Sequence, residues 1–191
     1  AAAPTASTNA ATSVTATQAA LNGTINPGSE ATTGWFRYDP TSPGTCNDSF
    51  GTRAPAAGGS SLGAGTSNTA YLQAISGLTA GTTYYYCAIA QNSTGTAVGG
   101  VLSFVTPLPP VAATTTASSI TNTSAYLEGV AIPNGSATTG YFRYSLTDPG
   151  TCNDAFGSRA PAAGGTALGT GTSAVNYSQQ VTGLSSGTTY Y

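Results

Sequence analysis

The sequence predicts an all-β protein built from two tandem β-sandwiches. Thr, Ser, Gly and Ala fill most of the polar and small positions of the 191-residue chain, and this composition favours strands and turns over helices. Short runs with strand character alternate with turn residues at the spacing typical of a sandwich. The pattern returns after 106 residues without a change of register, as Cys46 with Cys152 and Gly77 with Gly183 show.

The first repeat contains strands that we expect near residues 7–15, 19–26, 34–39, 69–75, 83–91 and 100–106. Their counterparts follow 106 residues later as far as the chain lasts. We expect the first sandwich to span residues 1–106, with a long insert at residues 40–68. A Pro-rich linker at 107–113 should precede the second sandwich at 114–191.

The second sandwich is expected to lack its C-terminal strands, because the repeat stops within its penultimate strand. An inner face and a strand edge would then be open where residues equivalent to Leu102 and Phe104 pack in the first repeat. Two explanations remain. Either the chain is a fragment whose continuation completes the fold, which we favour, or a neighbouring subunit contributes a segment by strand exchange.

The stretch ISGLTAGTTYYYCAIAQNSTG from Ile75, repeated as VTGLSSGTTYY from Val181, resembles the fibronectin type III and related immunoglobulin-like modules of bacterial surface and secreted proteins. The segments LNGTINP, WFRY and VLSFVT of the first repeat are similar to the same family. The resemblance implies immunoglobulin-like sandwiches, an extracellular or cell-surface location, and tyrosine-corner roles for Tyr84 and Tyr190. It implies no activity.

The insert departs from this family pattern, because it is longer than the usual connection. It contains GTCNDSFGTRAPAAGG (Gly44–Gly59), which returns as GTCNDAFGSRAPAAGG (Gly150–Gly165) with 14 of 16 residues unchanged. By contrast, Thr12–Thr33 and Ser118–Thr139 share only 10 of 22 residues. The repeated phrase has therefore diverged less than the early strands.

Side-chain alternation predicts where the insert lies. If Tyr84 points into the core, Tyr86 does too, and Cys87 lies on the outer face of its sheet. The same alternation puts Trp35 on that outer face, which would be an exposed apolar patch unless the insert covered it.

The cysteines suggest how the insert is held on that face. Cys46, near the start of the insert, is expected to form a disulfide with Cys87, and Phe50 then packs on Trp35 or Tyr85. Cys152, the counterpart of Cys46, is expected to be an unpaired or intermolecular thiol. The residue equivalent to Cys87 would lie two positions beyond Tyr191.

Eight of the ten charged residues fall in this strand and insert or in their repeat. The simplest expectation is a partly buried ion pair between an Arg and an Asp that fixes the insert. The alternative is a recognition surface on which a ligand contacts the charges. The candidate surface consists of Trp35, Arg37, Asp48, Phe50, Arg53, Tyr141, Arg143, Asp154, Phe156 and Arg159.

Several kinds of chemistry are not expected. Without His or Lys the chain lacks the usual general base and the Schiff-base residue, and "CND" lacks the alternating acidic ladder of a calcium site. Four Arg without a basic run, and a net charge of −2, argue against nucleic acid. No stretch reaches the roughly 20 apolar residues of a membrane span. We therefore predict no catalytic, metal-binding or cofactor-binding residues.

These observations predict a non-enzymatic extracellular structural repeat that forms a cell-surface filament, sheath or stalk by contacts with its own neighbouring repeats or subunits. One alternative is an adhesin or carbohydrate-binding module that binds a cell-surface glycan or protein. Another is an accessory module of a secreted hydrolase.

Overall fold

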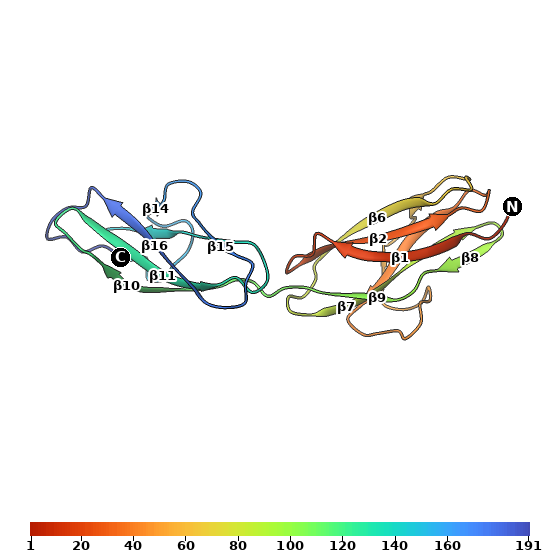
Figure 1. Ribbon diagram of the computed structural model, residues 1–191, viewed down its shortest axis with the longest axis horizontal. Coiled ribbons are helices and arrows are strands. Elements are labelled where there is room, and N and C mark those ends of the chain that lie inside the picture. Colours follow the sequence, from red (N-terminus) through yellow and green to blue (C-terminus); the bar gives the residue numbers. More distant parts are fainter. The chain divides into compact units, whose positions relative to one another are not determined.

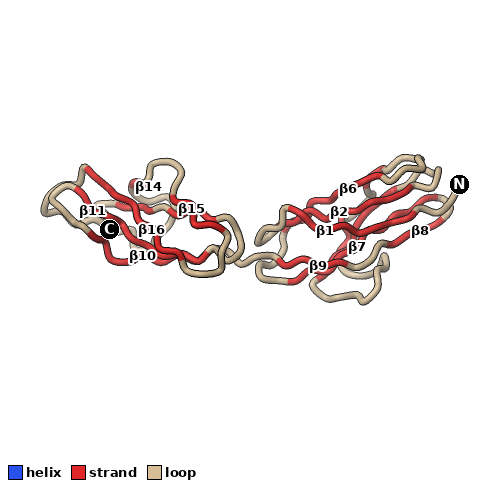
Figure 2. The backbone as a smooth tube through the Cα atoms, in the orientation of Figure 1, coloured by secondary structure: helices blue, strands red, loops and turns tan.

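The computed structural model describes residues 1–191, and all of its regular structure is strand (Figure 2). The predicted all-β class is confirmed. The chain divides into two compact units, Ala1–Pro107 (unit 1) and Leu108–Tyr191 (unit 2). No helix long and apolar enough to cross a membrane is present.

Unit 1 consists of antiparallel strands in two sheets (Figure 1). One sheet has the order β1-β2-β6, and the other has the order β4-β3-β7-β8, with β5 also pairing with β3 and β9 with β7. The strands are β1 (Thr5–Thr12), β2 (Gln18–Asn26), β3 (Thr33–Asp39), β4 (Thr52–Ala54), β5 (Ser60–Ser61), β6 (Thr69–Ser76), β7 (Thr83–Asn92), β8 (Gly95–Val98) and β9 (Leu102–Val105). All six expected strands of this repeat are found, whereas β4, β5 and β8 were not expected.

The core of unit 1 collects side chains from both sheets, an arrangement compatible with a β-sandwich. Alternate residues of β2 are buried, and Leu21 and Ile25 among them are fully inaccessible to solvent. Phe36 of β3 belongs to the same cluster and stacks on Tyr71 of β6, with ring centroids 4.7 Å apart. The period-2 alternation of buried positions therefore gives each sheet one face for the core.

The inward face of β7 is the expected one, since Tyr84 and Tyr86 both belong to the core cluster. The Tyr84 hydroxyl accepts a hydrogen bond of 3.0 Å from the backbone N–H of Thr79, five residues upstream. In unit 2, Tyr190 accepts the equivalent bond from the N–H of Ser185, also at 3.0 Å. These bonds are the ones that tyrosine-corner residues make.

The expectation for β9 is half right. Phe104 packs on the core, with its ring 5.8 Å from Tyr84 and 5.7 Å from Tyr86 between centroids. Leu102 is 39% exposed and does not belong to the core, which corrects the expectation that it packs inward. Leu102 pairs with Tyr86 at the end of the β7–β9 ladder.

Unit 2 repeats the order of the early strands and of the insert. Its sheets are β10-β11-β16, β12-β15 and β13-β14, all antiparallel. The strands are β10 (Val111–Ser118), β11 (Ser124–Ile132), β12 (Thr138–Gly140), β13 (Phe142–Tyr144), β14 (Ser158–Ala160), β15 (Thr166–Gly169) and β16 (Val175–Thr182). Strand β10 begins inside the expected linker, because Val111 already pairs with Ile132 of β11.

Candidate functional site

The insert contributes strands to the sheet as well as a loop that covers it. Strand β4 pairs with β3 from Phe36↔Ala54 to Tyr38↔Thr52, and β5 pairs with the start of β3. Between β3 and β4 the chain leaves the sheet and forms the orange loop below β7 and β9 in Figure 1. The sequence predicted that the insert covers the sheet, but it did not predict that the insert also pairs with β3.

Glycines allow the insert to approach β3 closely. Gly51 has φ +50°, and a Cβ at this position would lie 2.3 Å from the carbonyl oxygen of Tyr38. At Gly59 a Cβ would lie 2.6 Å from the carbonyl oxygen of Gly34. Gly157 and Gly165 make the same approaches in unit 2, with a Cβ 2.2 and 2.5 Å from backbone oxygens. The repeated phrase thus keeps glycine where any side chain would collide with the sheet.

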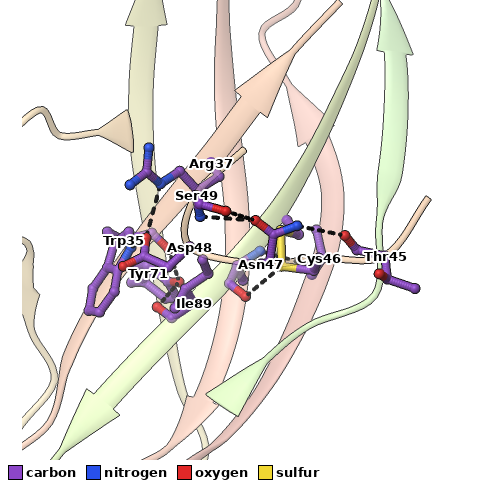
Figure 3. The surroundings of a disulfide bond; sticks show 12 residues. Trp35, Arg37, Thr45, Cys46, Asn47, Asp48, Ser49, Tyr71 and Ile89 are labelled. Atoms are coloured by element: carbon purple, nitrogen blue, oxygen red, sulfur yellow. Dashed lines mark hydrogen bonds and ion pairs between the residues drawn. A yellow bond between two sulfur atoms is a disulfide. The ribbon is translucent and has the colours of Figure 1, made fainter. Parts of the chain in front are cut away.

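The predicted disulfide is confirmed, since Cys46 is bonded to Cys87 with a Cα–Cα distance of 6.0 Å (Figure 3). Cys87 is fully buried in a second apolar cluster with Trp35 and Ile89, on the outer face of the sheet. Cys46 and Phe50 of the insert pack against this cluster, together with Val101. The insert therefore covers this face, and Trp35 is only 4% exposed.

Asp48 is the polar centre of the insert. Its Oδ1 atom accepts a hydrogen bond of 2.7 Å from the indole Nε1–H of Trp35 and one of 2.9 Å from Arg37 Nε (Figure 3). The guanidinium of Arg37 also donates to the carbonyl oxygen of Gly51 at 3.3 Å. The side chain of Arg37 is 18% exposed and that of Asp48 is 47% exposed, so the expected ion pair is present and partly buried.

Arg53 fixes the other side of the indole. Its guanidinium carbon lies 4.5 Å from the ring centroid of Trp35, within cation–π distance. The same guanidinium donates to the carbonyl oxygens of Pro55, at 2.8 Å, and Gly58. Trp35 is thus held by a carboxylate at its N–H and by a cation on its face.

Unit 2 repeats this arrangement with Tyr141 in the position of Trp35. Arg159 lies 3.9 Å from the Tyr141 ring centroid and donates to the carbonyl oxygens of Pro161, at 2.7 Å, and Gly164. Arg143 Nε donates to Asp154 Oδ1 at 3.1 Å. The remaining candidate, Phe156, is half-buried, and its carbonyl oxygen accepts a bond of 3.4 Å from Arg143.

The Tyr141 hydroxyl and the Asp154 carboxylate influence each other's protonation. Their hydrogen bond raises the pKa of Tyr141, with smaller contributions from burial and from the carboxylate charge. The same bond is the main cause that lowers the pKa of Asp154, and Arg143 adds to it. The carboxylate is therefore stabilised in its charged form even though it is exposed to solvent.

Cys152 lies at the position of Cys46 but has no partner in unit 2, where it is exposed. Its surroundings differ from those of Cys46, because no strand equivalent to the later part of β7 is present beside it.

Two positions differ between the copies of the phrase, and at one of them the Ser49 hydroxyl donates to Asn47 Oδ1 at 2.7 Å, a bond that Ala155 cannot make. Ser49 and Ala155 are both exposed, as are Thr52 and Ser158. The unchanged positions include Cys46, which forms the disulfide, Asp48, Arg53, the buried Ala54 and the close-contact glycines. The similarity between the two copies therefore follows most of the internal contacts of the insert.

Reasoning from the sequence missed two features of the candidate site. One is the hydrogen bond between the Trp35 indole and Asp48, which requires the conformation of the insert to be known. The other is the cation–π stacking of both inserts, although the recurrence of an aromatic residue and an Arg in both repeats was a usable signal.

Comparison with models of known protein families and with curated proteins finds no match to this chain. The disulfide is typical of proteins that mature in an oxidising compartment.

Proposed function

We propose that this chain is a non-enzymatic extracellular structural repeat, a building block of a cell-surface filament, sheath or stalk. Its units are immunoglobulin-like β-sandwiches of the fibronectin type III kind, arranged in tandem. The tyrosine hydrogen bonds of Tyr84 and Tyr190, the two-sheet core of unit 1 and the disulfide support this assignment.

The observation that carries the proposal is the internal use of the charged side chains. Arg37 and Asp48 bind each other. Arg53 stacks on the Trp35 ring and donates hydrogen bonds to two carbonyl oxygens of its own insert. A recognition surface would keep such groups free for a ligand. Because they stabilise the insert instead, we favour a structural unit over an adhesin or carbohydrate-binding module.

The test is the solution behaviour of the oxidised chain. Sedimentation velocity over a wide concentration range should show polymers that grow with concentration. Electron microscopy should then show that the chains in these polymers contact one another through folded units. Arg53→Ala should lower the free energy of unfolding of unit 1, because Arg53 stabilises the insert and binds no ligand.

A chain that stays monomeric at all concentrations and binds glycans on an array would contradict the proposal. The adhesin alternative would then be favoured if Arg53→Ala abolished that binding while the folded fraction stayed unchanged.

A further inference from the structure

The chain contains two Asn-Gly pairs, and the fold holds them in opposite ways. Asn22 and Gly23 lie inside β2, whereas Asn134 and Gly135 form the turn between β11 and β12. Asparagine is a chemically labile residue. Its lability is greatest before glycine, because the backbone nitrogen of a residue without a side chain meets little steric resistance as it approaches the asparagine amide carbon.

The ladder of β2 holds Gly23 on both sides. Strand β2 is the central strand of its sheet, and Gly23 pairs with Thr8 of β1 and with Tyr71 of β6. Gly23 is also buried. The Asn22 side chain donates a hydrogen bond of 2.8 Å to the carbonyl oxygen of Ala10. The Gly23 nitrogen therefore reaches the Asn22 side chain only when the sheet opens.

The turn at Asn134 holds its glycine loosely. Asn134 and Gly135 have φ values of +55° and +92°, the pattern of a type I′ turn. The N–H of Gly135 donates to the carbonyl oxygen of Gly171 at 3.4 Å, and that of Ser136 donates to the carbonyl oxygen of Pro133 at 3.4 Å. Both distances exceed the usual range for such bonds, and Gly135 is exposed. Small local openings therefore free the Gly135 nitrogen.

The side chain of Asn134 has a structural role that requires an amide. Its Nδ2 atom donates a hydrogen bond of 2.7 Å to the carbonyl oxygen of Pro109. Pro109 belongs to the segment Leu108–Pro110, which precedes β10 and forms no strand. Pro109 and Pro110 have no N–H, so the segment has few donors with which to hold itself in place. The Asn134 amide ties it to the turn.

We propose that Asn134–Gly135 is a site of spontaneous deamidation in the folded chain, and that the reaction releases the segment Leu108–Pro110 from the turn. The Gly135 nitrogen loses its proton and attacks Cγ of Asn134. The new C–N bond closes a succinimide ring, and the side-chain nitrogen takes up a proton and leaves as ammonia. Water then opens the ring at either carbonyl, which gives aspartate or isoaspartate. The inference does not depend on the proposed structural role of the chain.

Both products replace an amide donor by a carboxylate. An ionised carboxylate only accepts hydrogen bonds, so it cannot donate to the Pro109 carbonyl oxygen and repels it instead. Isoaspartate also lengthens the main chain of the turn by one carbon atom. Each reaction adds one negative charge to a chain whose net charge is −2.

The test incubates the purified chain at mildly alkaline pH and follows both pairs by peptide mapping. Trypsin cuts after arginine, so Asn22 falls in the peptide Ala1–Arg37 and Asn134 in the peptide Ala54–Arg143. Fragmentation in the mass spectrometer locates the new acid within each peptide. A parallel incubation in concentrated urea is the control, because both pairs have the same two residues once the fold is removed.

We expect Asn134 to deamidate at least about tenfold faster than Asn22 in the folded chain, because only the reaction at Asn22 must wait for a sheet to open. In urea the two rates should become similar. The proposal would be overturned if Asn134 reacted no faster than Asn22 in the folded chain, or if it reacted only in urea.

A second measurement follows the segment itself. Asn134→Asp is one product of the reaction, and it should speed amide hydrogen exchange at the start of β10, Val111–Ala113, by at least about threefold. Asn122→Asp is the matched control, because it adds the same charge at an exposed asparagine of the same unit. Unchanged exchange in Asn134→Asp, or an equal rise in Asn122→Asp, would overturn the proposal, since the Asn134 amide would then not hold the segment.

Discussion

Individual residues of the repeated phrase bind side chains of β3 as well as one another. A single carboxylate oxygen of Asp48 serves both an indole N–H and a guanidinium, and Arg53 covers the indole from its face. Removing one partner leaves the others with unpaired polar groups, and such losses exceed the net contribution of the bond itself. Single substitutions in the phrase are therefore expected to lower the free energy of unfolding by more than the loss of one hydrogen bond.

Asp48→Ala should lower the free energy of unfolding of unit 1 by about 1.5 kcal/mol, because the buried Trp35 N–H loses its acceptor. Asp48→Asn should cost about 0.5 kcal/mol, because its amide oxygen still accepts from the indole and only the half-exposed ion pair is lost. Urea unfolding followed by fluorescence of Trp35, the single tryptophan, measures both. Equal losses would mean that the charge, and not the indole bond, stabilises the insert.

Tyr141→Phe should raise the pKa of Asp154 toward its ordinary value, because it removes the hydrogen bond that lowers this pKa most. Arg143 keeps part of the depression. The stabilisation from Asp154 is present above the pKa of the unfolded state and is lost as the pH falls through the lower folded-state pKa. NMR titration of the side-chain carboxyl carbon reports the pKa, and an unchanged value would show that the tyrosine does not act on it.

The insert both extends the sheet and covers its outer face. Strands β4 and β5 extend the sheet along β3, and the loop between β3 and β4 folds back over the outer face. The turn that joins these parts passes so close to β3 that only glycine fits. The geometry of the whole insert is therefore sensitive to a few backbone positions.

Gly51→Ala should destabilise unit 1 by about 3 kcal/mol, through a positive φ and a collision with the Tyr38 carbonyl oxygen. Gly44→Ala is the matched control, because Gly44 has φ +70° but nothing within 4 Å of a Cβ. It should cost only about 1 kcal/mol. Urea unfolding of the two variants gives the comparison, and similar losses would rule out the close contact as the cause.

Side-chain alternation made most of the strands predictable. Strand β2 alternates buried and half-buried residues, and the same period placed Cys87 and Trp35 on one face, although β7 is buried on both faces from Tyr86 to Ala90. Strands β4 and β5, with three and two residues, are too short to show a period, and their pairing depends on where the disulfide holds the insert. The hydrogen bond between Asp48 and the Trp35 indole could not be predicted for the same reason.

At the scale of the whole molecule, two units of similar sequence differ in their cores. Unit 1 buries Leu21, Ile25, Phe36 and Tyr86 completely. The buried cluster of unit 2 consists of Ala125, Ala160 and Val181, and the larger buried residues Phe142 and Leu168, outside this cluster, keep 7% and 6% of their surface exposed. Since buried apolar area is the main source of stability, the units should not unfold together.

Unit 2 should therefore unfold at a lower urea concentration than unit 1. Far-UV circular dichroism, which reports both units, should begin to change before the fluorescence of Trp35, which reports unit 1 alone. Cys152→Ser is the control and should leave both transitions in place, because this thiol is unpaired. Coincident transitions would show that the two units unfold as one.

The disulfide also has a mechanical consequence. If the chain is pulled from its ends, the 41 peptide units between Cys46 and Cys87 form a closed loop that cannot be drawn out. At about 3.4 Å per residue, roughly 140 Å of contour length is withheld from the extension of unit 1. Force travels instead through the short covalent path across the two sulfurs, so an unfolded unit 1 extends only by the residues outside this loop until the bond is reduced. An array of such units therefore lengthens less under load in oxidising surroundings than in reducing ones.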